Sequence, residues 1–108
     1  MSFQNQFTKT TTDANLMETV HHGSAEYPFR YYYENIALFD FKCIDWHWHS
    51  ELEFIYIKSG NVVFDIGTVH FELNEGNGIM INSKILHRLQ SSSDAIIPNF
   101  LFQPSFIA

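Results

Sequence analysis

Residues 62–73, VVFDIGTVHFEL, can pair with one another in only one register, and this constrains the fold more than any other stretch. A two-residue loop at Gly67-Thr68 lets glycine supply the positive φ of a type II′ turn. The predicted opposite pairs are Ile66–Val69, Phe64–Phe71 and Val62–Leu73 on one face, and Asp65–His70 and Val63–Glu72 on the other. A shift by one residue would destroy the apolar match. The stretch therefore predicts an antiparallel hairpin with one buried face.

From residue 26 onward the chain is rich in aromatic and β-branched residues, broken at intervals by Gly, Asn and Ser. Short strands at such spacing are typical of an all-β sandwich or barrel, and no sustained helical pattern interrupts them. A length of 108 residues fits one domain, and a hydrophobic fraction of 45% is enough for a buried core. We therefore expect one all-β domain over residues 26–108.

Residues 1–25 differ in composition, because Thr, Asn, Gln and Ser dominate and apolar side chains are scattered. This composition predicts a flexible N-terminal arm. The alternative is an arm whose few apolar residues dock on the domain only when a ligand fills it.

The charge balance and the hydropathy pattern disfavour several classes of function. Twelve carboxylates against six Lys and Arg give a formal net charge of −6, which disfavours direct contact with a nucleic-acid backbone. The sequence has no apolar run long enough for a membrane helix, and its polar N-terminus does not resemble a secretory signal. The single cysteine, Cys43, cannot form an internal disulfide and agrees with a reducing compartment. We expect a cytoplasmic protein.

In WHWHSELEF, residues 46–54, two histidines and a glutamate interrupt a run of strand-forming residues. His47 and His49 are two positions apart and share one strand face, and Glu53 joins them if the strand resumes in phase. The neighbours divide accordingly, with Ile55 and Ile57 beside Glu53 and with Trp46, Trp48, Leu52, Phe54 and Tyr56 opposite. A carboxylate on an apolar face is costly unless it is paired or bound to a metal.

A third histidine, in NSKILHRLQSS, fits the same pattern. Polar Arg88 and Gln90 mark the outer face, so His87 points inward together with Ile85 and Leu89. The resulting set of donors suits zinc, iron, manganese or nickel without choosing among them: His47, His49, Glu53 and His87. Two alternatives remain: a metal-free pocket that binds a small polar effector through the same side chains, or a core in which they only satisfy one another.

The other histidines are expected to have no such role. His70 is accounted for by its pairing with Asp65 on a solvated face. His21 and His22 lie in the polar arm, where we expect both to be exposed.

The stretch HWHSELEFIYIKSG resembles the first cupin motif, from His47 to Gly60, and GNGIMINSKILHRLQS resembles the second, from Gly76 past His87. The sequence departs from the motifs in several turns. Phe41 stands where the first motif has glycine, and Asn82, Lys84 and Ser91 replace the proline, the second glycine and the asparagine of the second. All four residues at the metal positions of the motifs are retained: His47, His49, Glu53 and His87.

Residues 27–103 further resemble the N-terminal, effector-sensing domain of AraC-type bacterial transcription regulators. This resemblance implies a cupin jelly-roll barrel, that is, a double-stranded β-helix, with a small-molecule pocket inside it and a homodimer built through the same domain. It also implies that DNA is contacted only through a C-terminal pair of helix-turn-helix units. These units are absent from the 108 residues, so we expect the chain to be a fragment of a longer regulator.

The resemblance and the residues together predict a dimerising regulatory domain, not an enzyme, that senses a sugar-like or other small polar effector through His47, His49, Glu53 and His87. The alternatives are a stand-alone metal-dependent cupin enzyme, such as an isomerase or dioxygenase, and a dimerisation module without a working pocket. The identity of the effector depends on which aromatic residues line the pocket, and the sequence leaves these open among Phe29, Tyr31, Tyr33, Phe39, Phe41, Phe64 and Phe100.

Overall fold

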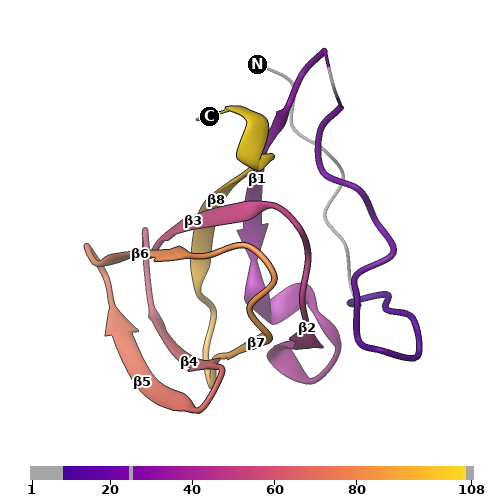
Figure 1. Ribbon diagram of the computed structural model, residues 1–108. Coiled ribbons are helices and arrows are strands. Elements are labelled where there is room, and N and C mark those ends of the chain that lie inside the picture. Colours follow the sequence, from indigo (N-terminus) through magenta and orange to yellow (C-terminus); the bar gives the residue numbers. More distant parts are fainter. Residues whose placement is uncertain (1–8, 25, 107–108) are drawn as a thin grey trace.

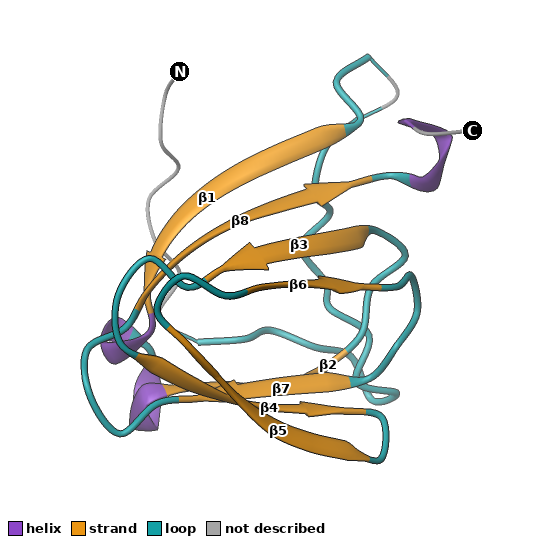
Figure 2. Ribbon diagram, turned by 90° about the vertical axis from the view of Figure 1, so that its left-hand side faces the viewer, coloured by secondary structure: helices purple, strands orange, loops and turns teal. Residues whose placement is uncertain are grey.

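The computed structural model describes residues 9–24 and 26–106, and in this part of the chain eight strands form two facing antiparallel sheets (Figure 2). The sheets have the strand orders β1-β8-β3-β6 and β2-β7-β4-β5. The strands are β1 (Phe29–Asn35), β2 (Cys43–His47), β3 (Leu52–Tyr56), β4 (Asn61–Ile66), β5 (Val69–Asn74), β6 (Gly78–Ile81), β7 (His87–Gln90) and β8 (Ile96–Phe102). Helical structure in this part is confined to the short 3-10 turns η1 (Ile36–Leu38), η2 (Asp40–Lys42) and η3 (Pro104–Phe106).

The order of the strands shows how the barrel closes. Among these strands, β4 and β5 are the one pair of sequence neighbours that also pair in a sheet, and every other pairing joins strands separated along the chain. Each β1–β8, β3–β8 and β2–β7 contact is therefore long-range, as in a jelly roll. The predicted all-β jelly-roll fold is confirmed.

The β4–β5 hairpin has the register predicted from its sequence, with Phe64 opposite Phe71 and Asp65 opposite His70. Gly67 has a φ of 58°, whereas Thr68 is not among the residues of positive φ, which is the pattern of a type II′ turn. The predicted pair on the solvated face is present as a hydrogen bond of 2.6 Å between His70 Nδ1 and Asp65 Oδ1.

The core lies between the two sheets, where inward-facing side chains of both meet. The largest fully buried apolar side chains are those of Ile36, Ile55, Ile57, Val62, Phe64, Ile81 and Ile97. Burial of each such side chain contributes about 1.5–3 kcal/mol, so this layer dominates the stability of the fold. As predicted, Ile55 and Ile57 lie on the inward face and Phe54 and Tyr56 on the outward one.

Two turns keep a left-handed backbone without glycine. Phe41 and Lys84, which replace motif glycines, have φ values of 58° and 64°, and Lys42 has 50°. The turns thus retain the conformation that glycine would favour, at a cost in strain. Phe41 is also 96% exposed.

The described part of the N-terminal segment packs along the turn between β2 and β3 (Figure 1). The Trp48 N–H donates to Leu16 O (3.0 Å), and the Glu18 N–H donates to Trp48 O (2.8 Å). The indole Nε1–H of Trp48 also donates to Asn15 O (3.0 Å). Residues 1–8 and 25 of the predicted arm lie outside the described residues. Within residues 9–24 and 26–106 no helix is both long and apolar enough to cross a bilayer.

Candidate metal centre and effector cavity

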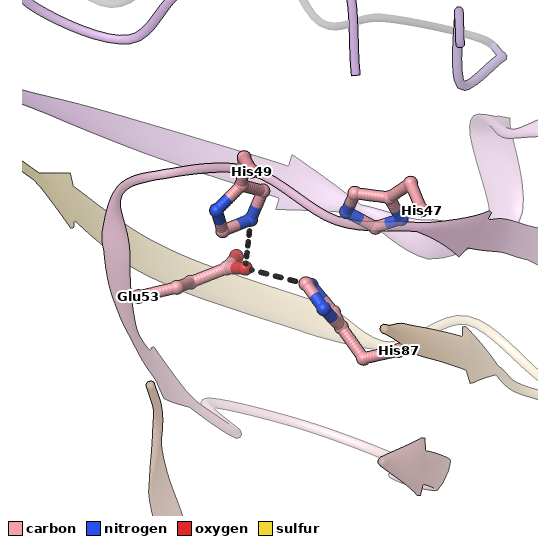
Figure 3. A group of neighbouring side chains, drawn as sticks. All are labelled: His47, His49, Glu53 and His87. Atoms are coloured by element: carbon pink, nitrogen blue, oxygen red, sulfur yellow. Dashed lines mark hydrogen bonds and ion pairs between the residues drawn. The ribbon is translucent and has the colours of Figure 1, made fainter. Parts of the chain in front are cut away.

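Four buried side chains converge at one point inside the barrel, as Figure 3 shows. Their potential ligand atoms all lie within 4.8 Å of one another. The residues are the four predicted from the sequence: His47 at the end of β2, His49 in the following turn, Glu53 on β3 and His87 at the start of β7. The predicted convergence is confirmed. Ile85, predicted to share their face, is instead 37% exposed, because β7 begins only at His87.

A bulge in β2 aims His47 into the barrel. Ile44 pairs with Leu89 and His47 pairs with His87, so β2 takes three steps where β7 takes two. Ile44 and His47 therefore both face inward despite their odd spacing, and the extra residue is accommodated at Asp45-Trp46. Sequence reasoning missed this bulge, although the odd spacing between inward Ile44 and inward His47 was a readable signal.

Backbone carbonyl groups bind the same nitrogen, Nδ1, of all three imidazole rings. Each Nδ1 is hydrogen-bonded to a carbonyl oxygen two residues away in the chain: His47 to Asp45 (2.7 Å), His49 to Glu51 (3.0 Å) and His87 to Ile85 (2.7 Å). A carbonyl accepts only, so Nδ1 carries the proton and, in a neutral ring, Nε2 presents a lone pair. This arrangement is typical of histidines that bind a metal through Nε2.

The same geometry calls for a cation. The Nε2 atoms of His49 and His87 both lie 3.2 Å from Oε1 of Glu53. If both rings were neutral, two lone pairs would face a carboxylate oxygen, which is unfavourable in a buried site. A proton or a metal ion between these atoms removes the conflict. The donor set therefore fits a divalent metal, and the buried cluster could hold one.

The charges of the metal-free cluster follow from burial and hydrogen bonding. Burial, together with the charge of His87, lowers the pKa of His47 to about 4. Burial also acts to lower the pKa of His49, but its hydrogen bond to Glu53 and the charge of that carboxylate raise the pKa to about 9. The pKa of Glu53 lies below its usual range, because the hydrogen bonds from His49 and His87 outweigh the effect of burial. In the metal-free protein at neutral pH, a proton therefore lies between His49 and Glu53.

A cavity of about 40 Å³, partly open to solvent, adjoins the cluster. It is lined by the barrel residues Tyr32, Glu34, Phe39, Ile44, His47, His49, Glu53, Leu89, Asn99 and Leu101, and by Lys9, Thr10, Thr11, Glu18, Val20 and His22 of the N-terminal segment. Since a water needs at least about 10–15 Å³, the space holds roughly three waters. Of the aromatic residues left open by the sequence, Phe39 lines this cavity, whereas Phe64 is in the core and Phe41 is exposed.

The wall formed by β1 and β8 carries a second polar group that the sequence analysis missed. The amide Nδ2 of Asn99 donates to Glu34 Oε1 (2.8 Å) and to Ile97 O (2.9 Å). Burial raises the pKa of Glu34 to about 7. The position of Asn99 between inward Ile97 and Leu101, a polar residue on an apolar strand face, was a usable signal.

Two buried oxygens at this cavity lack hydrogen-bond partners. Among the described residues, the buried side-chain polar atoms without a partner are Thr10 Oγ1 and Asn99 Oδ1, and both residues line the cavity. An orphaned buried polar atom costs about 1–3 kcal/mol, so a bound molecule that satisfies it is favoured. Because Asn99 uses its amide protons elsewhere, its Oδ1 requires a hydrogen-bond donor.

His22 links the N-terminal segment to the cluster, and the expectation that it is exposed was wrong. It is 4% exposed, whereas His21 is exposed as expected. Its N–H donates to Glu51 Oε2 (3.1 Å), its Nδ1 lies 2.7 Å from the Tyr32 hydroxyl, and its Nε2 pairs with Glu18. Sequence composition could not reveal this burial, because two of the three partners, Tyr32 and Glu51, lie outside the polar N-terminal segment.

The two facing sheets and the buried His/Glu cluster define a protein of the cupin class. The RmlC-like cupin from Shewanella frigidimarina NCIMB 400 has this fold, with a TM-score of 0.63 at 15% identity over 73% of this chain and 71% of that one. Oxalate decarboxylase from Bacillus subtilis, which has Mn(II) centres, matches with a TM-score of 0.54 at 23% identity over 59% of this chain and 19% of that one.

Within this class, residues 39–107 match the AraC-like ligand binding domain, and the chain belongs to this family. A curated relative is the uncharacterized HTH-type transcriptional regulator YdeC of Bacillus subtilis (strain 168), which is 37% identical over 75 residues. The match covers 69% of this chain and 26% of YdeC, so the chain spans about a quarter of the length of this relative.

Proposed function

We propose that residues 26–108 form the effector-binding, dimerising domain of a cytoplasmic transcription regulator, with residues 1–25 as an arm over its cavity. The observation that carries this proposal is the cavity itself, which is lined on one side by the N-terminal segment and on the other by His47, His49, Glu53 and Asn99. DNA would be contacted by a C-terminal helix-turn-helix domain of the kind named in YdeC. The domain itself senses and does not catalyse.

The effector is a small polar molecule rich in hydroxyl groups, such as a sugar. The support is the orphaned Asn99 Oδ1, which needs a donor, and the excess of acceptors around it, including Glu34 and Glu18. A hydroxyl group can donate to one such atom and accept from Thr10. Ligand pockets usually measure about 300–1,000 Å³, so a sugar enters only if the segment containing Thr10 and His22 moves away.

A bound ligand can shift an equilibrium only through different affinities for its two states. Movement of the segment supplies such a difference, because the open state accepts the effector and the closed state does not. The same four polar side chains, His47, His49, Glu53 and His87, would bind either the effector directly or a divalent metal beside it. Zinc, iron, manganese and nickel all suit the donors.

A stand-alone metal-dependent enzyme, an isomerase or dioxygenase, is the second candidate. It is favoured by the complete set of three histidines and one glutamate, which resembles a metal site with open positions. Sensor and enzyme make different predictions for a bound ligand, since only the enzyme converts it.

A calorimetric titration of the chain with a panel of pentoses, hexoses and polyols tests the sensor. We expect saturable binding of at least one probe, lost in Asn99→Leu and retained in His70→Ala, a matched change of a polar residue outside the cavity. Mass spectrometry should recover the probe unchanged. Binding that survives Asn99→Leu would contradict the effector site, and conversion of the probe would favour the enzyme. Metal analysis of protein prepared without chelator, compared with His47→Ala, tests the metal separately.

A further inference from the structure

The outer faces of the two sheets differ sharply in chemistry. On the β2-β7-β4-β5 sheet the outward residues are largely charged or polar, with Arg88 donating to Asp65 Oδ2 (2.9 Å) and lying over the Trp46 ring at 5.0 Å. Glu72 and His70 of β5 continue this surface. Such a face is suited to water.

The outer face of the β1-β8-β3-β6 sheet is apolar. One row crosses all four strands, since Tyr31 pairs with Phe100, Phe100 with Phe54 and Phe54 with Met80. A groove on this face is lined by Phe29, Phe54, Met80, Phe100 and Phe102. Six side chains of the face are 38–50% exposed: Phe29, Tyr33, Phe54, Tyr56, Met80 and Phe100.

The strands of this face contribute no charged side chain to it, although the chain carries a net charge of −6. A charge at its margin comes from Lys58, just after β3, whose Nζ donates to the Tyr33 hydroxyl (2.9 Å) and lies 5.0 Å from the centre of that ring. The outward positions of these four fully described strands contain no Asp, Glu, Lys or Arg: Phe29, Tyr31, Tyr33, Asn35, Leu52, Phe54, Tyr56, Gly78, Met80, Ile96, Pro98, Phe100 and Phe102. Two copies that meet here therefore bring together strand side chains without like charges, with Lys58 of each copy at the margin beside Tyr33. An exposed apolar patch of this extent marks an interaction surface.

We propose that the outer face of the β1-β8-β3-β6 sheet is the surface through which two copies of this chain associate. The inference rests on the self-association proposed above and assigns it to a face. With about 200 Å² for a side chain of this size, the six exposed residues offer about 500 Å² per copy. Two copies then bury about 1,000 Å², the lower limit for a specific interface. Apolar sheets pack face to face in this way about 10 Å apart.

Sedimentation velocity of the 108-residue chain over a concentration series tests the proposal. We expect a reversible dimer with a dissociation constant on the order of 10 µM, at the weak end of the range for protein interfaces because the buried area is small. Met80→Lys and Phe100→Lys each place a charge in the apolar row and should raise this constant at least about 100-fold. Phe41→Lys is the matched control, because Phe41 is 96% exposed and lies away from this face.

Circular dichroism melting curves verify that both lysine variants remain folded, which is expected since both side chains point out of the barrel. A chain that stays monomeric at about 300 µM, or folded variants that dimerise as tightly as Phe41→Lys, would overturn the assignment. Neither metal nor sugar enters the readout. Failure of the effector proposal therefore leaves the result for this face interpretable.

Discussion

The Nε2 atom of His87 lies 3.2 Å from the Oε1 atom of Glu53, although the two residues are 34 positions apart in the chain. The same oxygen lies 3.2 Å from Nε2 of His49. One carboxylate oxygen thus serves two imidazoles whose opposite nitrogens are already bonded to backbone carbonyls. In the metal-free protein a proton lies between this oxygen and His49, and a metal ion can replace that proton.

Metal binding should therefore compete with protons. The pKa of His49 is raised to about 9 by Glu53, so Zn²⁺ must displace at least one proton at neutral pH. The proton stabilises the metal-free form, and lowering the pH therefore weakens binding. Between pH 6 and 8 we expect the apparent association constant to rise at least about tenfold per pH unit. Calorimetry in buffers of different ionisation enthalpy measures the protons released, with His70→Ala as control. A constant independent of pH would refute this prediction.

Glu34 should make the stability of the metal-free protein fall as the pH rises. Burial raises its folded-state pKa from 4.5 to about 7, so between these values the folded state binds more protons than the unfolded state. The free energy of unfolding then decreases through this window and levels off above it. Glu34→Gln cannot ionise and retains an acceptor for Asn99. Relative to the parent, it should gain about 2–3 kcal/mol of stability between pH 5 and pH 8.

Urea denaturation with a chelator present, at pH 5 and pH 8, measures this difference. Glu72→Gln, an exposed change on β5, is the control and should show no such trend. If the stability difference between Glu34→Gln and the parent is the same at both pH values, the prediction that the pKa of Glu34 is raised in the folded state is wrong.

His22→Ala should loosen the N-terminal segment from the barrel. The substitution removes a buried imidazole that contacts Tyr32 and Glu18. The loss of one buried hydrogen bond, about 1–3 kcal/mol, favours local opening. We expect the Glu18 amide, which donates to Trp48 O, to exchange its hydrogen roughly ten times faster or more. Nuclear magnetic resonance measures the exchange, and His21→Ala should leave the rate unchanged because His21 is exposed. Equal rates in the two variants would speak against a docked segment.

Lys84→Gly should stabilise the fold. Lys84 has a φ of 64° and an exposed side chain, and its N–H donates to His49 O (2.8 Å), a bond that glycine keeps. Relief of the left-handed strain, less the entropy that glycine loses on folding, leaves a gain of about 0.5–1 kcal/mol. Thermal unfolding measures it. Lys84→Ala retains the Cβ atom and should not be stabilised. If Lys84→Ala were stabilised as much as Lys84→Gly, the gain would come from removing the lysine side chain and not from relief of backbone strain.

The periodicity of the sequence determined those features of the fold that depend only on residues close together in the chain. The period of two placed His47, His49, Glu53 and His87 on inward faces, and the β4–β5 register followed from apolar pairing across a two-residue turn. Both are local rules, because successive strand side chains alternate and a tight hairpin fixes its own register. The cupin motifs also predicted the fold from local sequence, because each motif is one contiguous stretch of the chain.

Only the tertiary structure decided which distant segments meet. The bulge at Asp45-Trp46 shows only against β7, and the Glu34–Asn99 contact joins residues 65 positions apart. Burial of His22 needs Glu51 and Tyr32 beside it. The apolar outer face also exists only as a surface, because its four strands are not consecutive in the chain and come together only when the barrel closes.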